Sequence, residues 1–324
     1  MLSPPHILHL STYDQLGGAA KAAKHIVEAQ ISIGIQAQLL VLIKTGSDSF
    51  VKTPHWEDPK VSLKLVHEIS KTRRTHQLAD STELNSFGDA SANIVDYINT
   101  CNAEIVHLHW ISNLLSIEDI GKITKPIVWT LHDMWPFVGS EHIATNFLND
   151  AYFYHPPKND IINPPNEIEM LSKQVWLKKC NHWNSSDFTI VSPSIWLANI
   201  SKKSFLFHKC STHIIYHPIQ AEKWKQQSKV AARTDFYLPS SKTVLLFIAN
   251  NPTSDLNKGW DLLCNAIENL QSKDKANIEL VVVGGKEQIA TSEQYPFKLR
   301  WIENLNNNKL LSKLYSAADA LLVV

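Results

Sequence analysis

The 324-residue sequence predicts an α/β fold that contains two parallel β-sheets in succession. Short runs rich in Val, Ile and Leu alternate with amphipathic segments, which is typical of parallel strands covered by helices on both faces. A polar stretch near residue 225 separates two such series and predicts a hinge between two Rossmann-like halves. We therefore expect an N-terminal domain over residues 1–222 and a C-terminal domain over residues 223–324.

The first series begins with an apolar run at 6–10, followed by the glycine pair Gly17 and Gly18 and a helical stretch at 19–34. Further buried strands are expected at 36–43, 103–110, 125–133, 188–194 and 211–219. Ligands of open parallel sheets bind outside the carboxyl ends of the strands. Functional residues are therefore expected where these strands end.

The second series is shorter and ends in an apolar strand. Its elements are expected as strands at 242–250, 277–285 and 318–324, with helices near 257–271 and 306–317. A buried parallel strand is a poor place for a chain to stop, because further sheet and helix should cover it. The sequence therefore predicts that the second domain is incomplete and that the protein is truncated at its C-terminus.

Composition excludes several classes of function. Lys and Arg total 31, as do Asp and Glu, so neither sign of charge favours a general nucleic-acid binder. The four cysteines form no CxxC pair, and they indicate neither a zinc site nor a disulfide framework. No leader-like start and no apolar run of ~18 residues is present. The default expectation is a soluble, cytoplasmic protein.

Gly17 and Gly18 follow the first strand and open a helix. Glycines there let backbone N–H groups approach a ligand, and a helix N-terminus favours anions. A tight turn alone would explain the pair equally well. The segment is not GxGxxG, which counts against a dinucleotide dehydrogenase.

Histidines gather at the ends of the expected central strands. His107 and His109 are spaced i and i+2 and face one side of a strand; they could ligate a metal, but no third ligand is evident, so we interpret them as cleft-lining or hydrogen-bonded core residues. His132 and Asp133 end the next strand, in the segment WTLHDMWPF, and lead into a loop. They are either functional groups on a rigid scaffold or part of a strand end packed by aromatic rings.

Two strand-to-helix junctions also carry candidate residues. Ser192 or Ser194 can cap a helix, which alone would explain their presence. Lys258 is expected in the first turn of a helix capped by Ser254 or Asp255, where a cation opposes the helix dipole at a cost of roughly 0.3–1 kcal/mol. A bound phosphate would remove that cost, although an ordinary surface lysine remains the alternative.

Taken together, ordered segments of the chain resemble the family 4 glycosyltransferases of bacterial polysaccharide and colanic-acid-type biosynthesis. The segments are GGAAKAA, VHLHW, WTLHDMWPFVGSEH, VSPSIWLA, YHPI, NKGWDLL, LVVVGG and LYSAADALLV. The resemblance implies the GT-B fold, in which the active cleft lies between two Rossmann-like domains. It also implies retaining transfer of a sugar from a nucleotide-diphosphate donor to a saccharide or lipid-linked acceptor, with no metal or other cofactor.

The resemblance assigns roles to residues of this sequence. His132 would orient the transferring sugar, with Asp133 beside it as the second catalytic residue, and Lys258 would neutralise the diphosphate leaving group. The other donor-binding positions are Gly17, Gly18, Asn250, Gly284 and Gly285. The acceptor side of the cleft is assigned to His109, Trp110, Trp135 and Ser192. Because the implied acceptor can be lipid-linked, the resemblance also allows a peripheral association of the protein with the inner face of the membrane.

The sequence departs from the family pattern in two places. Ala249-Asn250 replaces the usual Gly-Arg, which removes one of two cationic diphosphate contacts, and the expected Glu-x7-Glu motif would fall beyond residue 324. Two alternatives to a glycosyltransferase therefore stay open. One is a non-catalytic remnant that binds only an acceptor or partner. The other is a nicotinamide-dependent oxidoreductase, which has the same sheet architecture, although this sequence lacks the glycine pattern of those enzymes.

Overall fold

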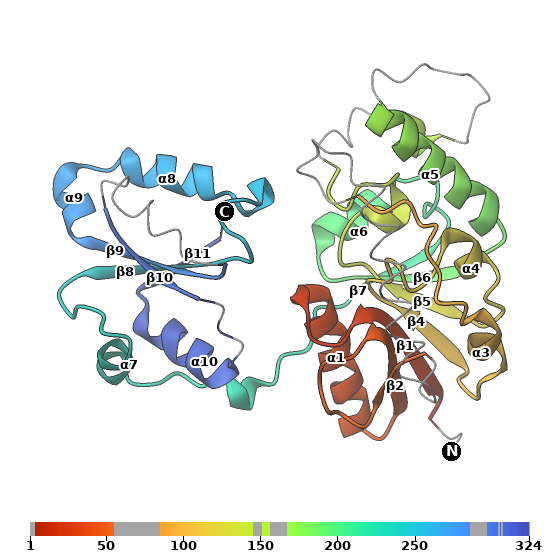
Figure 1. Cartoon of the computed structure of the whole chain (residues 1–324), viewed down its shortest axis with the longest axis horizontal. Helices are drawn as coiled ribbons and strands as arrows, with labels where there is room; N and C mark the ends of the chain where they lie inside the picture. Colours follow the sequence, from red (N-terminus) through yellow and green to blue (C-terminus); the bar gives the residue numbers. More distant parts are fainter. Residues whose placement is uncertain are drawn as a thin grey trace. The chain divides into compact units, whose positions relative to one another are not determined.

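A computed structural model describes residues 4–54, 85–144, 151–155, 167–285, 297–303, 305 and 307–323 (Figure 1). Contacts divide the chain into two compact units, Met1–Pro218 and Ile219–Val324. The division follows Pro218, whereas the sequence predicts it after residue 222. Each unit has its own sheet and its own hydrophobic core.

The first unit contains a seven-stranded, wholly parallel sheet with the order β3-β2-β1-β4-β5-β6-β7. The strands are β1 His6–Tyr13, β2 Gln36–Ile43, β3 Val51–Lys52, β4 Ile105–Leu108, β5 Ile127–Thr130, β6 Phe188–Ser192 and β7 Ser211–Ile214. A strand forms at each expected apolar run, but the buried strand expected at 211–219 is wrong: β7 ends at Ile214, lies at the edge of the sheet and is mostly exposed. The two-residue β3 was not predicted, because two residues carry no periodic signal.

Helices lie on both faces of this sheet (Figure 1). They are α1 Gly17–Ser32, α3 Val95–Thr100, α4 Ile117–Gly121, α5 Glu167–Trp183 and α6 Ile195–Ser201, with 3-10 turns η1 Trp135–Phe137 and η2 Ala151–Tyr154. Of the two serines considered as a cap, it is Ser194 that caps α6, by accepting a hydrogen bond from the Leu197 N–H at 3.2 Å. Among the described helices, none is long and apolar enough to cross a membrane.

Both central strands of the first sheet are shorter than predicted, and this positions the functional candidates. Strand β4 ends at Leu108 and β5 ends at Thr130, so the ends expected at residues 110 and 133 are wrong, although one backbone hydrogen bond, from the Thr12 N–H to the Trp110 carbonyl at 2.8 Å, lies beyond β4. The sequence predicted longer strands because the residues just after β4 and β5 are also buried or half-buried, so the apolar pattern extends past the strand ends. His109 and His132 therefore lie just past the strands, at the carboxyl edge of the sheet.

A cluster of large rings supports this edge from within the unit. Trp129 on β5 is fully buried and packs edge-on against Trp183 and Phe188, with ring centroids 5.5 and 5.7 Å apart. Trp135, in the loop after β5, joins the same cluster against Trp183 at 6.2 Å. The loop that follows β5 is thus anchored on the core.

The second unit contains a four-stranded parallel sheet with the order β10-β9-β8-β11. The strands are β8 Thr243–Ile248, β9 Ile278–Val283, β10 Lys298–Ile302 and β11 Ala320–Leu322; the helices are α7 Lys229–Asp235, α8 Trp260–Glu268, α9 Ser272–Ala276 and α10 Asn308–Ala317; the 3-10 turns are η3 Ala221–Lys223 and η4 Leu256–Lys258. Helices α7 and α10 cover one face of the sheet, and α8 covers the other (Figure 1). Strand β10 was not predicted, because its sequence mixes charged and apolar residues.

The position of Lys258 differs from the prediction. It ends the 3-10 turn η4 and does not lie in the first turn of α8, because Gly259 has φ +67° and separates the two elements. Asp255 caps the 3-10 turn and not the helix, and its carboxylate lies 3.4 Å from the Lys258 ammonium. The argument that Lys258 opposes the dipole of α8 is therefore wrong, since the cation has a carboxylate beside it and lies outside the helix.

Candidate functional site

Three predicted site residues of the first unit follow adjacent strands. Gly17 lies beyond the end of β1, His109 directly follows β4, and His132 follows β5, and these strands are neighbours in the sheet. Gly17 opens α1 with φ +85°, a conformation that favours glycine, and neither it nor Gly18 has a neighbour within 4 Å of an added Cβ. Space is therefore open above the amino end of α1.

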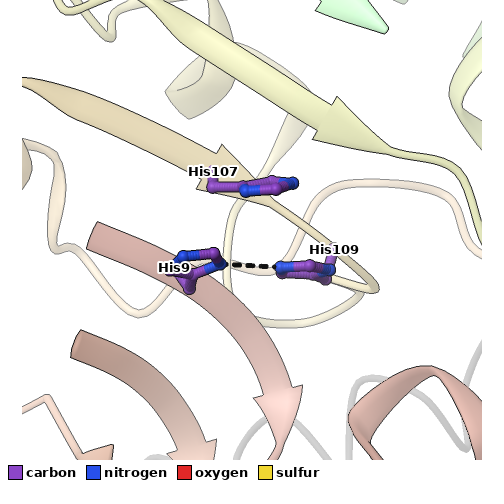
Figure 2. A group of neighbouring side chains, drawn as sticks. All are labelled: His9, His107 and His109. Carbon is purple, nitrogen blue, oxygen red and sulfur yellow. Dashed lines mark hydrogen bonds between the residues drawn. The ribbon is translucent and has the colours of Figure 1, made fainter. Parts of the chain in front are cut away.

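Sequence reasoning missed the histidine that completes the cluster. His9 on β1 pairs directly with His107 on β4, because the two strands are parallel and in register there. Figure 2 shows His9 and His109 side by side with the ring of His107 next to both. All three side chains are buried, with exposed fractions of 0%, 7% and 2%. The alternation of HILHL could have revealed His9, had the pairing of β1 with β4 been known.

Hydrogen bonds join three of the histidines into one line. His9 Nε2 lies 2.7 Å from Gln30 Oε1 on α1, and His9 Nδ1 lies 3.0 Å from His109 Nε2. His109 Nδ1 lies 3.1 Å from His132 Nε2. The line thus runs from a helix, through two buried strand-end rings, to the half-buried ring of His132.

His132 also contacts a second unpredicted histidine. The ring of His217, in the segment after β7, stacks on His132 with centroids 5.3 Å apart. The sequence analysis recognised YHPI as part of the resemblance but gave His217 no role. Nδ1 of His132 has no hydrogen-bond partner among the described residues. This nitrogen is therefore available to a ligand.

Burial makes these imidazoles neutral. Desolvation lowers the pKa of His9 to about 4 and that of His132 to about 4. The pKa values of His107 and His109 also lie well below the usual value, first because of burial and then because the neighbouring histidines repel a second charge. At neutral pH each ring therefore carries one N–H and one lone pair.

One nitrogen of each of His9, His107 and His109 lies within 4.8 Å of the other two, a spacing that invites a test for a metal site. Three imidazoles can bind zinc when their lone pairs, which lie in the ring planes, converge on one point. The rings of His107 and His109 instead stack at 20° with centroids 4.5 Å apart, and His107 Nε2 bonds Thr130 Oγ1 at 2.7 Å. This geometry favours a hydrogen-bonded cluster over a three-histidine metal centre.

The hydrogen bonds of the Asp133 side chain are to the loop that follows β5. One carboxylate oxygen accepts a hydrogen bond from the Trp135 N–H at 3.1 Å, and the other lies 2.5 Å from His142 Nδ1. His142 Nε2 in turn lies 2.7 Å from Ser86 Oγ. The structure therefore gives Asp133 a role in holding the loop, and its predicted catalytic role stays a prediction.

The Ser86, His142 and Asp133 side chains have the connectivity of a hydrolase triad. A carboxylate only accepts, so the Asp133 contact requires the proton on Nδ1 of His142. The Trp110 indole N–H also points at that nitrogen, from 3.1 Å, and Ser86 Oγ bonds Ser112 Oγ at 2.9 Å. The serine and the imidazole are thus held in a partly buried network of hydrogen bonds, which favours a structural role for the three residues.

The predicted acceptor residues lie in different environments. Trp110 is half-buried and stacks on Tyr13 with centroids 6.2 Å apart. Trp135 is 3% exposed and donates its indole N–H to the Ser86 carbonyl. Ser192 is fully buried, and its hydroxyl donates to the Ser194 carbonyl at 2.9 Å. Of these three, Trp110 alone has exposed surface to offer a ligand.

In the second unit, two loops at the carboxyl edge carry the predicted donor residues. Asn250 is exposed just after β8, and Gly284 and Gly285 follow β9 with positive φ angles. A Cβ added to Gly285 would lie 3.4 Å from Pro252, so the two loops are neighbours. Lys258 ends the first of these loops and is about one-third exposed. The four residues therefore share one edge of the second sheet.

Comparison with solved structures identifies the fold. The chain matches WaaG, a glycosyltransferase involved in lipopolysaccharide biosynthesis, over 98% of its own length and 74% of that chain, with 11% identity and a TM-score of 0.56. It matches Anabaena Alr3699/HepE in complex with UDP and glucose over 98% and 73%, with 10% identity and a TM-score of 0.55. The complex of HepE with UDP-glucose gives 12% identity and a TM-score of 0.53. No protein-family model and no curated protein sequence matches the chain. The chain has the α/β architecture of the GT-B glycosyltransferases.

Proposed function

We propose that this chain is a glycosyltransferase that moves a sugar from a nucleotide-diphosphate donor to a saccharide or lipid-linked acceptor in polysaccharide biosynthesis. The observation that carries the proposal is the match, across 98% of the chain, to a fold that in HepE holds UDP-glucose. Polar groups at the carboxyl edges of both sheets support it, because this is where such sheets bind ligands.

Some of the candidate residues would bind the sugar, and others would bind the diphosphate. His132 offers a free ring nitrogen to a sugar hydroxyl, and the half-buried Trp110, which follows β4, offers the exposed part of its ring. Lys258 would offset the negative charge that develops on the departing diphosphate. Gly17, Gly18, Gly284 and Gly285 let backbone N–H groups approach the donor. The proposal requires no metal or other cofactor and includes retention of anomeric configuration.

The acceptor is proposed to be presented at a lipid surface. Large apolar side chains are exposed beyond the strands of the first sheet, where Leu16 and Trp196 are 65% and 63% exposed. Exposed apolar groups near a binding edge suit a peripheral contact with the inner face of a membrane.

Calorimetric titration tests the donor half of the proposal. UDP-glucose and UDP should bind, NAD should not, and Lys258→Ala should weaken UDP binding about tenfold, since it removes a charged contact. Lys273→Ala is the matched control, because Lys273 is an exposed lysine of the same unit. Binding of NAD without UDP would indicate an oxidoreductase. Absence of any nucleotide binding would indicate a non-catalytic protein.

A radiolabelled UDP-sugar with a lipid-linked saccharide tests the transfer itself. The expected result is labelled acceptor whose new bond has the anomeric configuration of the donor, read by proton NMR. An inverted product would overturn the retaining mechanism and leave the transferase proposal standing.

A further inference from the structure

The line of histidines has a direction, because each neutral imidazole has one donor and one acceptor nitrogen. An amide oxygen can only accept, so Gln30 Oε1 requires the proton of His9 to sit on Nε2. Nδ1 of His9 is then a lone pair, and the contact at 3.0 Å requires His109 to donate from Nε2. The hydrogen bond between Gln30 and His9 therefore determines which nitrogen of His109 carries the proton.

The same donor–acceptor argument applies to the contact between His109 and His132. With its proton on Nε2, His109 has a lone pair on Nδ1, and the 3.1 Å contact requires His132 to donate from its own Nε2. Nδ1 of His132 is left as a lone pair that no described residue engages. A lone pair accepts a hydrogen bond and repels an anionic oxygen.

We propose that Gln30, acting through His9 and His109, fixes the Nε2–H tautomer of His132, so that His132 accepts a hydrogen bond from a hydroxyl of its ligand and cannot donate one to a phosphate. Gln30, His9 and His109 are positioning residues, since each acts through the next. The hydroxyl ligand rests on the proposed function, whereas the tautomer rests only on the hydrogen bonds within the first unit.

Neutrality of the rings is what makes the line unidirectional. A protonated imidazole has two donors and would break the order at that ring. The low pKa values of His9 and His132, about 4 in each case, keep the line intact at neutral pH. His107 lies outside the line, because it bonds Thr130. Its buried ring packs against His9 and His109 at 4.5 Å from each and helps to exclude water.

Nitrogen-15 NMR of the full chain labelled in histidine tests the tautomer directly. Two-bond correlations distinguish Nε2–H from Nδ1–H rings, and a His132→Gln sample assigns the resonance of His132. The expected result at pH 7 is the Nε2–H form for His9, His109 and His132. An Nδ1–H form of His132 would overturn the proposal.

A substitution at the start of the line tests the role of Gln30. Gln30→Met has similar length but lacks the amide oxygen, so His132 should become a mixture of the two tautomers. Gln36→Met is the matched control, because Gln36 is exposed at the start of β2 and lies outside the line. A fully Nε2–H His132 in Gln30→Met would show that something other than Gln30 sets the tautomer.

Binding of deoxygenated donors tests the hydroxyl ligand. One of a series of singly deoxygenated UDP-glucose analogues should bind the wild type about 3- to 10-fold more weakly than UDP-glucose, because the lone pair of His132 loses its partner. Gln30→Met should reduce this difference and leave UDP binding unchanged. An equal difference in both proteins would overturn the claim. If UDP-glucose failed to bind at all, the proposed function would fail while the NMR result still decided the tautomer.

Discussion

His132 lies at the exposed end of a line of buried side chains, and its surroundings make it a neutral hydrogen-bonding group. Desolvation lowers its pKa to about 4, and among the described residues it contacts His109 through a hydrogen bond and the stacked ring of His217. The sequence singled out His132 because a polar residue at the end of an apolar strand is easy to see. It could not single out Gln30 or His9, since their importance depends on which strands and helices become neighbours.

The substitution His132→Ala is expected to reduce turnover far more than stability. The ring is half-buried and makes one hydrogen bond, so the free energy of unfolding should fall by only about 0.5–1.5 kcal/mol. Turnover of UDP-glucose should fall by about tenfold or more, because the sugar loses a contact in the transition state. Urea unfolding and a radiolabel assay measure the two effects. A loss of several kcal/mol with normal turnover per folded molecule would assign His132 to the core.

Acid should destabilise the first unit through its buried histidines. Their pKa values in the folded chain lie below the usual 6.5, so the unfolded chain binds protons first as the pH falls. The stabilisation is therefore complete above pH 6.5 and is lost between pH 6.5 and about 4. Each such histidine adds up to about 1.4 kcal/mol per pH unit to the slope.

Urea unfolding at a series of pH values checks this dependence. His9→Gln should make the slope of unfolding free energy against pH shallower by up to one proton, since one buried titrating ring is gone. His208→Gln is the matched control, because His208 is exposed on the surface of the first unit and lies outside the buried cluster; the slope of His9→Gln is compared with that of this variant. Equal slopes for wild type and His9→Gln would contradict the burial argument.

At the scale of elements, helix α5 holds the loop that carries Asp133. Lys179 of α5 is fully buried and donates hydrogen bonds to the carbonyls of Trp135, Val138 and Gly139. Its ammonium also lies 3.9 Å from the centre of the Trp135 ring. Sequence reasoning did not anticipate this element, because a lysine is among the residues least often buried and its partners are backbone atoms that no sequence pattern marks.

Lys179→Met should lower the free energy of unfolding by about 3–5 kcal/mol, because three buried carbonyls lose their donor. The neighbouring Lys178 is a matched control. It forms ion pairs with Asp89 and Glu118 near the surface, so Lys178→Met should cost about 0–1 kcal/mol. Urea unfolding of the two variants under one set of conditions makes the comparison. Similar losses in both would show that the loop does not depend on Lys179.

At the scale of the whole molecule, the apolar residues form separate cores in the two units. The main cluster of the first unit includes Leu108, and Leu246 lies in a cluster of the second unit. This level of the fold was predictable, because parallel strands need apolar runs and the two series of runs are separated by a polar stretch. The positions of α7 and β10 were not, since short or mixed segments give weak periodicity.

Calorimetry is expected to resolve two unfolding transitions, one for each unit. Leu108→Ala should shift one transition and Leu246→Ala the other, because each side chain is fully buried in its own core and its removal costs about 2–5 kcal/mol locally. A single transition that both variants shift equally would show that the units unfold as one cooperative body.

The attachment of the histidine line to α1 gives the molecule a built-in spectroscopic reporter. Gln30 lies near the carboxyl end of the helix that begins at Gly17, and its side-chain amide is the far terminus of the hydrogen bonds that end at His132. Hydrogen bonds in a chain polarise one another, so a hydroxyl that engages His132 should perturb the electron density along the whole series. The carboxamide resonances of Gln30 would then register ligand occupancy from the end of the line opposite His132.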